Sequence, residues 1–356
     1  GTVYPILFMI SITHLLNDMM QSVIPAVYPL LKEKFGFTFA QIGIITLVFQ
    51  MTSSLLQPFI GLYADRHPRP YSLAAGMCFT LLGLFTLSVA PGFVPILLAV
   101  GLIGCGSSVF HPESSRVAQL ASGGRKGLAQ SIFQVGGNAG GAMGPLLAAL
   151  VVIPFGQASI GWFALAAILA ILILTRIGNW YKLRLTVTAN HPAAAAAAPA
   201  HHLGKRKIRL ALGILGVLVF SKSFYIASMT NYFTFFLMDK FGISVQGSQY
   251  CLFAFLGASA VGTVAGGPLG DRFGRKYVIW GSILGAAPFT LLLPYANLTC
   301  TIVLAVIIGL VISSAFSAIL VYATDLMPGK VGMVAGILLG IITGFLPNIE
   351  GKTTNT

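Results

Sequence analysis

Long apolar runs recur from one end of this 356-residue sequence to the other. A helix needs about 20 apolar residues to cross the hydrocarbon core of a bilayer, and most of the runs are close to this length. Charged residues are only 8% of the chain and hydrophobic residues are 56%, so a soluble fold could not cover its surface. We predict membrane helices near residues 4–30, 40–63, 71–90, 94–118, 128–153, 160–178, 208–236, 248–269, 276–294 and 300–326, and an eleventh apolar run at 331–346.

The net charge of +13 is spread unevenly over the predicted loops. If the N-terminus is cytoplasmic, the loops on the cytoplasmic side hold Arg66, Arg69, Arg125, Lys126, Lys182, Arg184, Lys205, Arg206, Lys207, Arg209, Arg272, Arg275, Lys276 and Lys330. The opposite loops hold only Lys32, Lys34 and Lys240. Because cytoplasmic loops of membrane proteins are enriched in Lys and Arg, we predict that both termini are cytoplasmic. The same asymmetry explains the net charge without a nucleic-acid partner.

Residues 179–207 are the longest polar stretch, and we predict a cytoplasmic linker there between helix bundles at 1–178 and 208–356. Its histidines, His191, His201 and His202, allow a metal site, although a solvated linker fits the composition better. The four cysteines form no CxxC pair, and no metal-ligand spacing is present. We therefore expect no metal.

The first apolar run contains His14 and Asp18. Such polar residues suit a retained helix better than the apolar region of a cleaved signal peptide.

Two short patterns recur at an offset of 206 residues. The segment LKEKFG at 31–36 resembles LMDKFG at 237–242, and GLYADR at 61–66 resembles GPLGDR at 267–272. Two matches in one ungapped register predict two halves of the same orientation, as in transporters with parallel repeats. This register requires a longer second half than the residues present. We therefore expect a segment to be missing around 337–343 and twelve helices in the intact protein.

The segment GPLGDRFGRK at 267–276 connects the eighth and ninth predicted helices. Its glycines permit a tight turn, and Asp271 can cap or pair at the inner face. The segment matches the loop signature G-x-L-x-D-R-x-G-R-K of the major facilitator superfamily at every fixed position. This resemblance implies a latch between the two halves, made by Asp65, Arg66, Asp271, Arg272 and Arg275. The first copy, at 61–70, lacks the second glycine and the final lysine.

The fifth predicted helix carries a run of small residues. Gly140 and Gly144 are four apart and precede Pro145; such spacing allows close helix contact, and proline bends a helix. The pattern resembles the antiporter motif of the superfamily, and ordinary packing is the alternative.

The segments 11–18, 110–116 and 345–350 resemble superfamily exporters that confer fosmidomycin resistance on bacteria. The resemblance implies efflux of a small phosphonate antibiotic across the inner membrane in exchange for protons.

Titratable residues inside predicted membrane helices are candidate coupling sites, because an ionised group there is costly unless it faces a cavity or a partner. His14 and Asp18 lie one turn apart on the first helix, where Asp18 can exchange a proton and His14 can tune it. On the fourth helix, His111 and Glu113 flank a proline and Arg116 follows. Paired with Arg116, Glu113 stays ionised, and unpaired it binds a proton. The alternative is that these pairs only lock helices together.

Polar residues on three helices are candidates for binding cargo. On the seventh helix, Lys222, Tyr225 and Tyr232 form a stripe in which the lysine suits an anionic cargo. Gln21 lies on the first helix, and Gln134 and Asn138 share one face of the fifth. Alternatively, Lys222 reaches toward the membrane surface and the polar residues of the fifth helix bridge helices.

These observations predict an all-α membrane protein with the major facilitator fold, made of two six-helix bundles. The favoured function is proton-coupled antiport of fosmidomycin or related small anions, and an uptake symporter for an organic anion or sugar is the alternative, because fold alone does not exclude it. The sequence has no G-x-x-x-x-G-K-[ST] motif, so we expect a proton gradient and no cofactor. Without a nucleophile–base set, we expect no enzyme. The expected partners are a small anionic drug or metabolite, protons and the lipid bilayer, with the chain a monomer.

Overall fold

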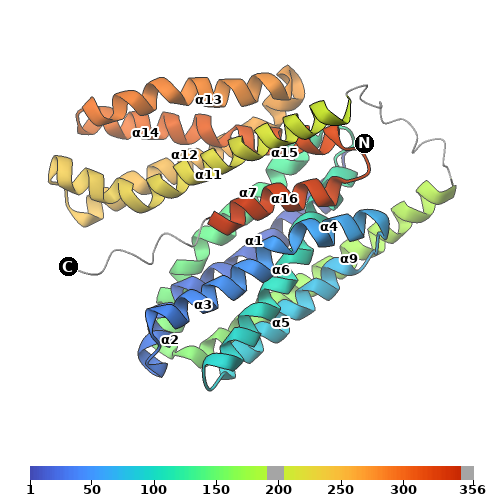
Figure 1. Cartoon of the computed structure of the whole chain (residues 1–356), viewed down its shortest axis with the longest axis horizontal. Helices are drawn as coiled ribbons and strands as arrows, with labels where there is room; N and C mark the ends of the chain where they lie inside the picture. The colour runs from blue at the N-terminus through green and yellow to red at the C-terminus, as the bar shows by residue number, and fades with distance from the viewer. Residues whose placement is uncertain (191–203, 346–356) are drawn as a thin grey trace.

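The computed structural model describes residues 1–190 and 204–345. The described part is α-helical, with short π- and 3-10 turns, and forms two bundles that lie at an angle to each other (Figure 1). Ten of its helical spans are long and apolar enough to cross a membrane, so the predicted multi-pass membrane protein is confirmed. The three histidines considered for a metal site in the linker lie outside the described residues.

The N-terminal bundle contains six of the ten spans. Its elements are α1 (Tyr4–Ala26), α2 (Tyr28–Phe35), α3 (Phe39–Gln50), η1 (Met51–Leu55), α4 (Gln57–Arg66), α5 (Ser72–Val89), α6 (Phe93–Ala121), α7 (Lys126–Leu147), η2 (Ala148–Val152), α8 (Ile153–Phe155), η3 (Gln157–Trp162) and α9 (Phe163–Asn190). The predicted helix at 4–30 is divided at Val27, between Pro25 and Pro29. A proline nitrogen cannot donate to the helix ladder, so this proline-flanked position ends α1.

The C-terminal bundle contains the other four spans and a shorter apolar helix. Its elements are α11 (Lys205–Phe241), α12 (Val245–Phe273), α13 (Arg275–Leu292), η4 (Leu293–Tyr295), α14 (Leu298–Ser313), α15 (Ala315–Leu326) and α16 (Val331–Phe345). The helix predicted at 300–326 is interrupted at Ser314. α16 runs without a break through the region around 337–343.

The predicted linker at 179–207 is helical at both of its described ends. α9 continues twelve residues beyond its predicted end, to Asn190, and α11 begins at Lys205. The sequence here is polar but contains no helix breaker before the proline that follows His191. Polar sequence indicates where the chain leaves the hydrocarbon layer of the membrane, but the helix itself can continue beyond that point.

The 206-residue repeat has a direct structural counterpart. Gly36 and Gly242 end α2 and α11 in the left-handed conformation, with φ of 65° and 63°, which glycine adopts without steric cost. Two residues later, Thr38 and Ser244 cap α3 and α12: each hydroxyl accepts a hydrogen bond from a backbone N–H of the first turn, at 3.2 and 3.1 Å. Both halves therefore make the same turn between corresponding helices, as the predicted repeat requires.

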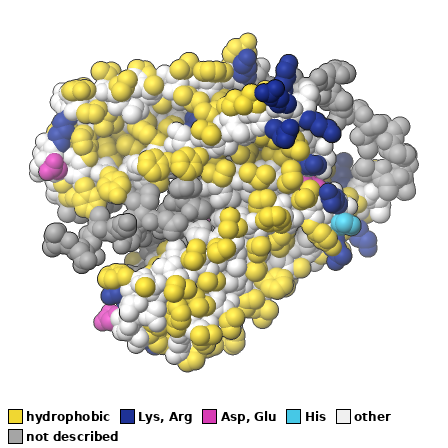
Figure 2. Space-filling model, viewed as in Figure 1, with side chains coloured by type: hydrophobic (Ala, Val, Ile, Leu, Met, Phe, Trp, Pro, Cys, Tyr) yellow, Lys and Arg dark blue, Asp and Glu magenta, His cyan; other side chains and the backbone are white. Residues whose placement is uncertain are grey.

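The outer surface of the bundles is mostly apolar, and the cations are gathered at one end. Figure 2 shows hydrophobic side chains over most of the visible face and most of its Lys and Arg side chains at the right-hand end. The same end holds the loops with Arg66, Arg69, Arg125, Arg272 and Lys276; we call it the basic end. Large apolar side chains such as Phe253 and Leu165 are more than 70% exposed, which suits surfaces in contact with lipid chains.

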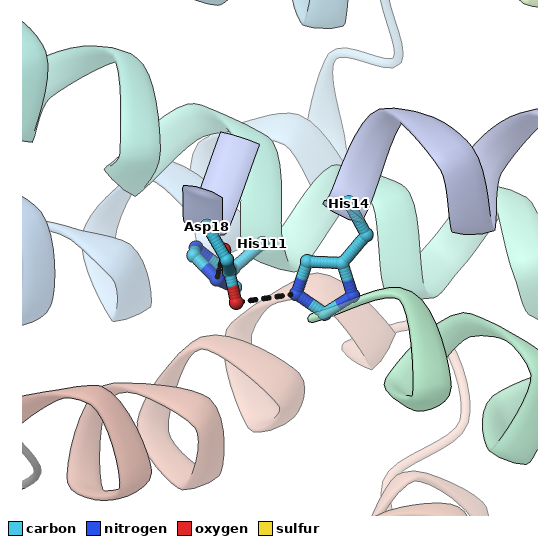
Figure 3. A group of neighbouring side chains, drawn as sticks. All are labelled: His14, Asp18 and His111. Atoms are coloured by element: carbon cyan, nitrogen blue, oxygen red, sulfur yellow. Dashed lines mark ion pairs between the residues drawn. The ribbon is translucent and has the colours of Figure 1, made fainter. Parts of the chain in front are cut away.

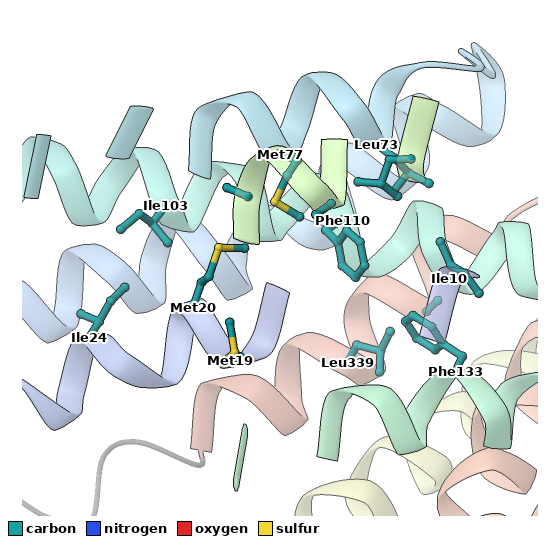
Figure 4. Close-up of a cluster of buried hydrophobic side chains, with 14 of the residues drawn as sticks. Ile10, Met19, Met20, Ile24, Leu73, Met77, Ile103, Phe110, Phe133 and Leu339 are labelled. Atoms are coloured by element: carbon teal, nitrogen blue, oxygen red, sulfur yellow. The ribbon is translucent and has the colours of Figure 1, made fainter. Parts of the chain in front are cut away.

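The core of the N-terminal bundle is built where α1, α5, α6 and α7 meet (Figure 4). Met20 and Ile24 of α1, Met77 of α5, Ile103 of α6 and Phe133 of α7 are all fully buried. Close approach of α1 and α7 depends on glycine, because a Cβ on Gly140 would lie 2.9 Å from the backbone nitrogen of Met19. This packing fixes the polar residues of α1 against α6 and α7.

Candidate functional site

Three titratable side chains meet inside the N-terminal bundle. His14 and Asp18 lie one turn apart on α1, and His111 reaches them from α6 (Figure 3). The Nε2 atom of His14 is 3.2 Å from Asp18 Oδ2, and the Nε2 atom of His111 is 3.3 Å from Asp18 Oδ1. Both histidines are buried, whereas the Asp18 side chain is 22% exposed. We call these three residues the His–Asp–His cluster.

The other nitrogen of each imidazole faces a backbone carbonyl group. His14 Nδ1 lies 2.8 Å from the carbonyl oxygen of Phe133, and His111 Nδ1 lies 3.1 Å from that of Ser107. A carbonyl oxygen only accepts hydrogen bonds, so both Nδ1 atoms carry a hydrogen. The His14 ring also stacks on the Phe133 ring, with centroids 4.0 Å apart. These contacts set the orientation of both rings and point both Nε2 atoms at Asp18.

In this orientation the cluster has the chemistry to bind protons. In a neutral imidazole with hydrogen on Nδ1, Nε2 is an acceptor, and an ionised carboxylate is also only an acceptor. Each contact between Nε2 and Asp18 therefore becomes a hydrogen bond only when a proton lies on one of its two atoms. The cluster has two such contacts, so it can take up two protons. Asn17 donates a further hydrogen bond of 3.0 Å to Asp18 Oδ1.

The glycine run of α7 brings the backbone close to this cluster. A Cβ on Gly137 would lie 2.5 Å from Nε2 of His14 and 2.9 Å from Oδ2 of Asp18. Gly140 and Gly144 of the predicted antiporter motif pack in the same way on α1, against Leu15 and Ser22. The side chain of Pro145 is outside the described part of the chain.

Glu113 lies on another face of α6 from His111, although only two residues separate them. Its carboxylate accepts a hydrogen bond of 2.9 Å from Ser72 of α5 and pairs with Arg116 at 3.3 Å. Arg116 also donates to the carbonyl oxygen of Ala64 at 2.5 Å and lies 4.0 Å from Asp65. The predicted coupling residues thus form two groups: the His–Asp–His cluster, and a second group of Glu113 and Arg116 beside Asp65.

Asp65 connects that second group to the other bundle. Its two oxygens accept hydrogen bonds of 2.9 Å from the backbone N–H groups of Gly332 and Met333, in the first turn of α16. In the same way, Asp271 of α12 accepts hydrogen bonds of 2.9 and 3.0 Å from Gly127 and Leu128, in the first turn of α7. We call these two contacts the helix-capping latches. Both join the bundles at the basic end.

Salt bridges flank the latch at Asp271. Asp325 of α15 pairs with Arg275 of α13 and, across the bundle boundary, with Lys126 of α7 at 2.6 Å. Arg275 also lies 3.8 Å from Asp271. The other two residues of the predicted latch, Arg66 and Arg272, are exposed at the basic end and take no part in the inter-bundle bonds found among the described residues.

The residues predicted to bind cargo lie in several places. Lys222 and Tyr225 point into the C-terminal bundle: Lys222 donates to Ser282 of α13 and to the carbonyl of Ile312, and Tyr225 bonds Thr290 of α13 at 3.1 Å. Tyr232 is half exposed and lines a surface hollow with Asp239. The other three predicted cargo residues lie in the N-terminal bundle. The Nε2 atom of Gln21 has no hydrogen-bond partner among the described residues. Gln134 and Asn138 form a hydrogen bond of 3.4 Å with each other.

Several residues of these sites were missed from the sequence. Asn17 and Gly137 stand beside recognised motif residues, so their proximity was the available signal. Ser72 belongs to no motif, and Lys126 was predicted only as a cation of a cytoplasmic loop. They become partners of Glu113 and Asp325 only through tertiary packing. No metal-ligand spacing is visible in the sequence, yet one ligand atom from each member of the His–Asp–His cluster lies within 4.8 Å of the others. This cluster is where the described residues could hold an ion.

Comparison with known proteins places these features in a family. The family model "Major Facilitator Superfamily" matches residues 10–345. The chain is 58% identical over 343 residues to the fosmidomycin resistance protein of Escherichia coli (strain K12), covering 96% of this chain and 84% of that protein. It is 45% identical over 343 residues to the uncharacterized MFS-type transporter YfnC of Bacillus subtilis (strain 168), again covering 96% of this chain and 84% of that protein.

A solved structure agrees at the level of the fold. The human organic anion transporter MFSD10 superposes with a TM-score of 0.72 at 17% identity, covering 96% of this chain and 91% of that one. The predicted fold is therefore confirmed, and the family to which the chain belongs consists of transporters, as the repeat and the loop signature led us to expect. This chain is a membrane transporter of the major facilitator superfamily.

Proposed function

We propose that this transporter exports fosmidomycin or related small anionic antibiotics and takes up protons in exchange. The observation that carries the coupling is the His–Asp–His cluster, whose two Nε2–carboxylate contacts each require a proton. The cargo is supported by the 58% identity to a fosmidomycin resistance protein over nearly the whole chain. The direction of coupling is supported by the resemblance of the α7 glycines, packed here on α1, to the antiporter motif.

In this proposal the basic end faces the cytoplasm of a bacterial inner membrane, because Lys and Arg are enriched on that side. The helix-capping latches hold the bundles together at the basic end, so cargo cannot enter from the cytoplasm in this conformation. Asp18 is partly exposed within the membrane region and can receive protons from the other side. Release of the latches, with the bundles rocking about the centre, then allows proton loss and cargo entry at the basic end.

The proposal assigns roles to polar residues of α1, α6 and α7. His14 and His111 hold the protons with Asp18, while Gln21, Gln134 and Asn138 offer neutral hydrogen-bonding groups on the neighbouring faces of α1 and α7 for cargo. Whether Glu113 carries a coupling proton as well is decided by the variants described in the Discussion. The alternative of an uptake symporter predicts proton and cargo movement in the same direction.

The test uses purified protein in liposomes that contain a pH-sensitive dye, measured both without and with a metal chelator on both sides. Drug-driven proton flux is expected, with protons moving opposite to the drug. Asp18→Asn keeps the size and polarity of the side chain but cannot ionise, so it should abolish drug-driven proton flux while exchange of labelled for unlabelled drug continues. Asp239→Asn, an exposed acid at the far end of α11, is the matched control and should behave like the parent.

Each contrary result has a distinct meaning. Proton flux in the same direction as the drug would replace antiport by symport. An unchanged proton-to-drug ratio in Asp18→Asn would remove the cluster from the coupling mechanism. Proton flux that is present without the chelator and lost with it would show that the cluster requires a bound metal ion.

A further inference from the structure

Lys222 is a buried lysine that the proposed exchange does not use. It lies at the middle of α11 and is 3% exposed. The carboxylates among the described residues make no ion pair with it. The other charged residues of α11 lie at its two ends, and those of α13 are Arg275 and Lys276 in its first turn. α14 and α16 carry none, and those of α12 and α15 are Asp271, Arg272 and Asp325 in the last turns of their helices at the basic end. The nearby titratable Tyr225 bonds Thr290.

The hydrogen bonds of Lys222 involve two acceptors. Its Nζ donates to Ser282 Oγ at 2.6 Å and to the carbonyl oxygen of Ile312 at 3.1 Å. The Ser282 hydroxyl donates its own hydrogen to the carbonyl of Ile279 at 2.8 Å, so toward Lys222 it can only accept. No third acceptor for Nζ is found in the described parts of the chain.

The Ile312 carbonyl is available because the helix is interrupted. α14 ends at Ser313 and α15 begins at Ala315, and the last carbonyl groups of a helix have no partner within it. Ser314 Oγ donates to the carbonyl of Val311 at 2.7 Å, and Lys222 satisfies the next one. Lys222 therefore joins α11, α13 and the break between α14 and α15.

The number of donors decides which form of the side chain fits. An ammonium group has three N–H donors and a neutral amine has two, and the site offers two acceptors. The carbonyl end of a helix favours a cation, but an unpaired charge buried in a membrane helix is costly, and its third N–H would have no acceptor. We infer that Lys222 is held as a neutral amine in this conformation and forms a second proton-binding site, inside the C-terminal bundle.

This site has a defined effect on the bundle. A proton taken up by Lys222 introduces a charge and an unsatisfied donor between α11, α13 and the helix break, so it loosens their packing. The site is separate from the His–Asp–His cluster of the other bundle, and it does not depend on the identity of the cargo. It also differs from the role in anion binding expected from the sequence, since its partners are structural groups of the same bundle.

Substitutions that imitate the two forms test the inference in purified full-length protein in lipid nanodiscs. Lys222→Gln supplies a neutral group with two N–H donors and should melt within about 2 °C of the parent at neutral pH, while Lys222→Arg, which stays charged and has five donors, should melt at least about 4 °C lower. Lys240, at the exposed end of the same helix, donates to the carbonyls of Pro294 and Ala296. Lys240→Gln and Lys240→Arg are the matched controls, and arginine should be tolerated there.

Carbon-13 NMR of the lysine Cε atoms decides the matter in the parent protein, even where a variant does not fold. The Lys222 signal is identified by its loss in Lys222→Gln, or in Lys222→Met if that variant folds better. At neutral pH it should lie at the position of a neutral amine and move to the ammonium position on acidification, while the Lys240 signal stays at the ammonium position. A Lys222 signal at the ammonium position at neutral pH overturns the inference, as does an arginine variant that is more stable than the glutamine variant.

Discussion

Asp65 and Asp271 lie 206 residues apart, and each caps a helix of the opposite bundle through the same two positions of its first turn. The glycines four residues before them, Gly61 and Gly267, face the carbonyl groups of Gly332 and Gly127 so closely that a Cβ would overlap. A carboxylate at a helix N-terminus is stabilised both by the free N–H groups and by the helix dipole. The two latches therefore hold the basic end closed by the same physical means.

Removing the latch charges should open the basic end. Asp65→Asn and Asp271→Asn each remove one accepting oxygen and a charge at a helix N-terminus worth about 0.3–1 kcal/mol, which shifts the equilibrium between closed and open forms by about two- to fivefold. Electron paramagnetic resonance distances between spin labels at His67 and Lys330, in protein without its native cysteines, measure the change. The double variant should shift further than either single variant. Unaltered distance distributions in all three would show that the caps do not control closure.

Gly137 is expected to be essential for the geometry of the His–Asp–His cluster. The methyl group of Gly137→Ala would overlap the His14 ring and crowd Asp18, so we expect a loss of about 1–3 kcal/mol in stability and reduced drug-driven proton flux. Gly141→Ala, on the same helix, is the matched control because its Cβ would meet open space, and replacing glycine by alanine in a helix is favourable by up to about 1 kcal/mol. Equal melting temperatures of the two variants would contradict this role.

Glu113 and Asp18 are expected to behave differently. Ser72 and Arg116 donate to different oxygens of Glu113. In Glu113→Gln the amide oxygen can accept from Arg116 and the amide nitrogen can donate to the Ser72 hydroxyl, and Arg116 keeps Asp65 as a carboxylate neighbour. We expect Glu113→Gln to keep the parental proton-to-drug ratio in the liposome assay, in contrast to Asp18→Asn. If Glu113→Gln instead transports drug without protons, the coupling role that the sequence suggested for Glu113 is the correct one.

The salt bridge between Lys126 and Asp325 is expected to add only modestly to closure. Lys126 is 38% exposed, and exposed ion pairs contribute about 0–1 kcal/mol and weaken as salt increases. Lys126→Met should lower the melting temperature slightly at low salt and by less at high salt. Arg125→Met, the exposed neighbour, serves as the control. A salt-independent loss in Lys126→Met would assign the effect to packing of the side chain and not to its charge.

The segments that cross the membrane were predictable because length and apolarity are local properties. Each predicted run overlaps a helix of the structure, and the repeat at 31–36 and 237–242 correctly indicated a shared turn. Ends and interruptions were less predictable: α9 continues into polar sequence to Asn190, and the helix predicted at 300–326 is interrupted at Ser314. A helix end depends on which partner takes up its free backbone groups, and Lys222, far along the chain, does so at the α14–α15 break.

By itself the sequence determined that the chain is a helical membrane protein with two similarly oriented halves, and it pointed to Asp18, Asp65 and Asp271 through their motifs. Only the tertiary structure decided the partners of these residues. His111 and Glu113 are two residues apart in one helix, yet one reaches Asp18 of α1 and the other Ser72 of α5. Successive positions of a helix point in directions about 100° apart, so the neighbours of each side chain depend on how whole helices pack, and no local pattern of residues contains that information.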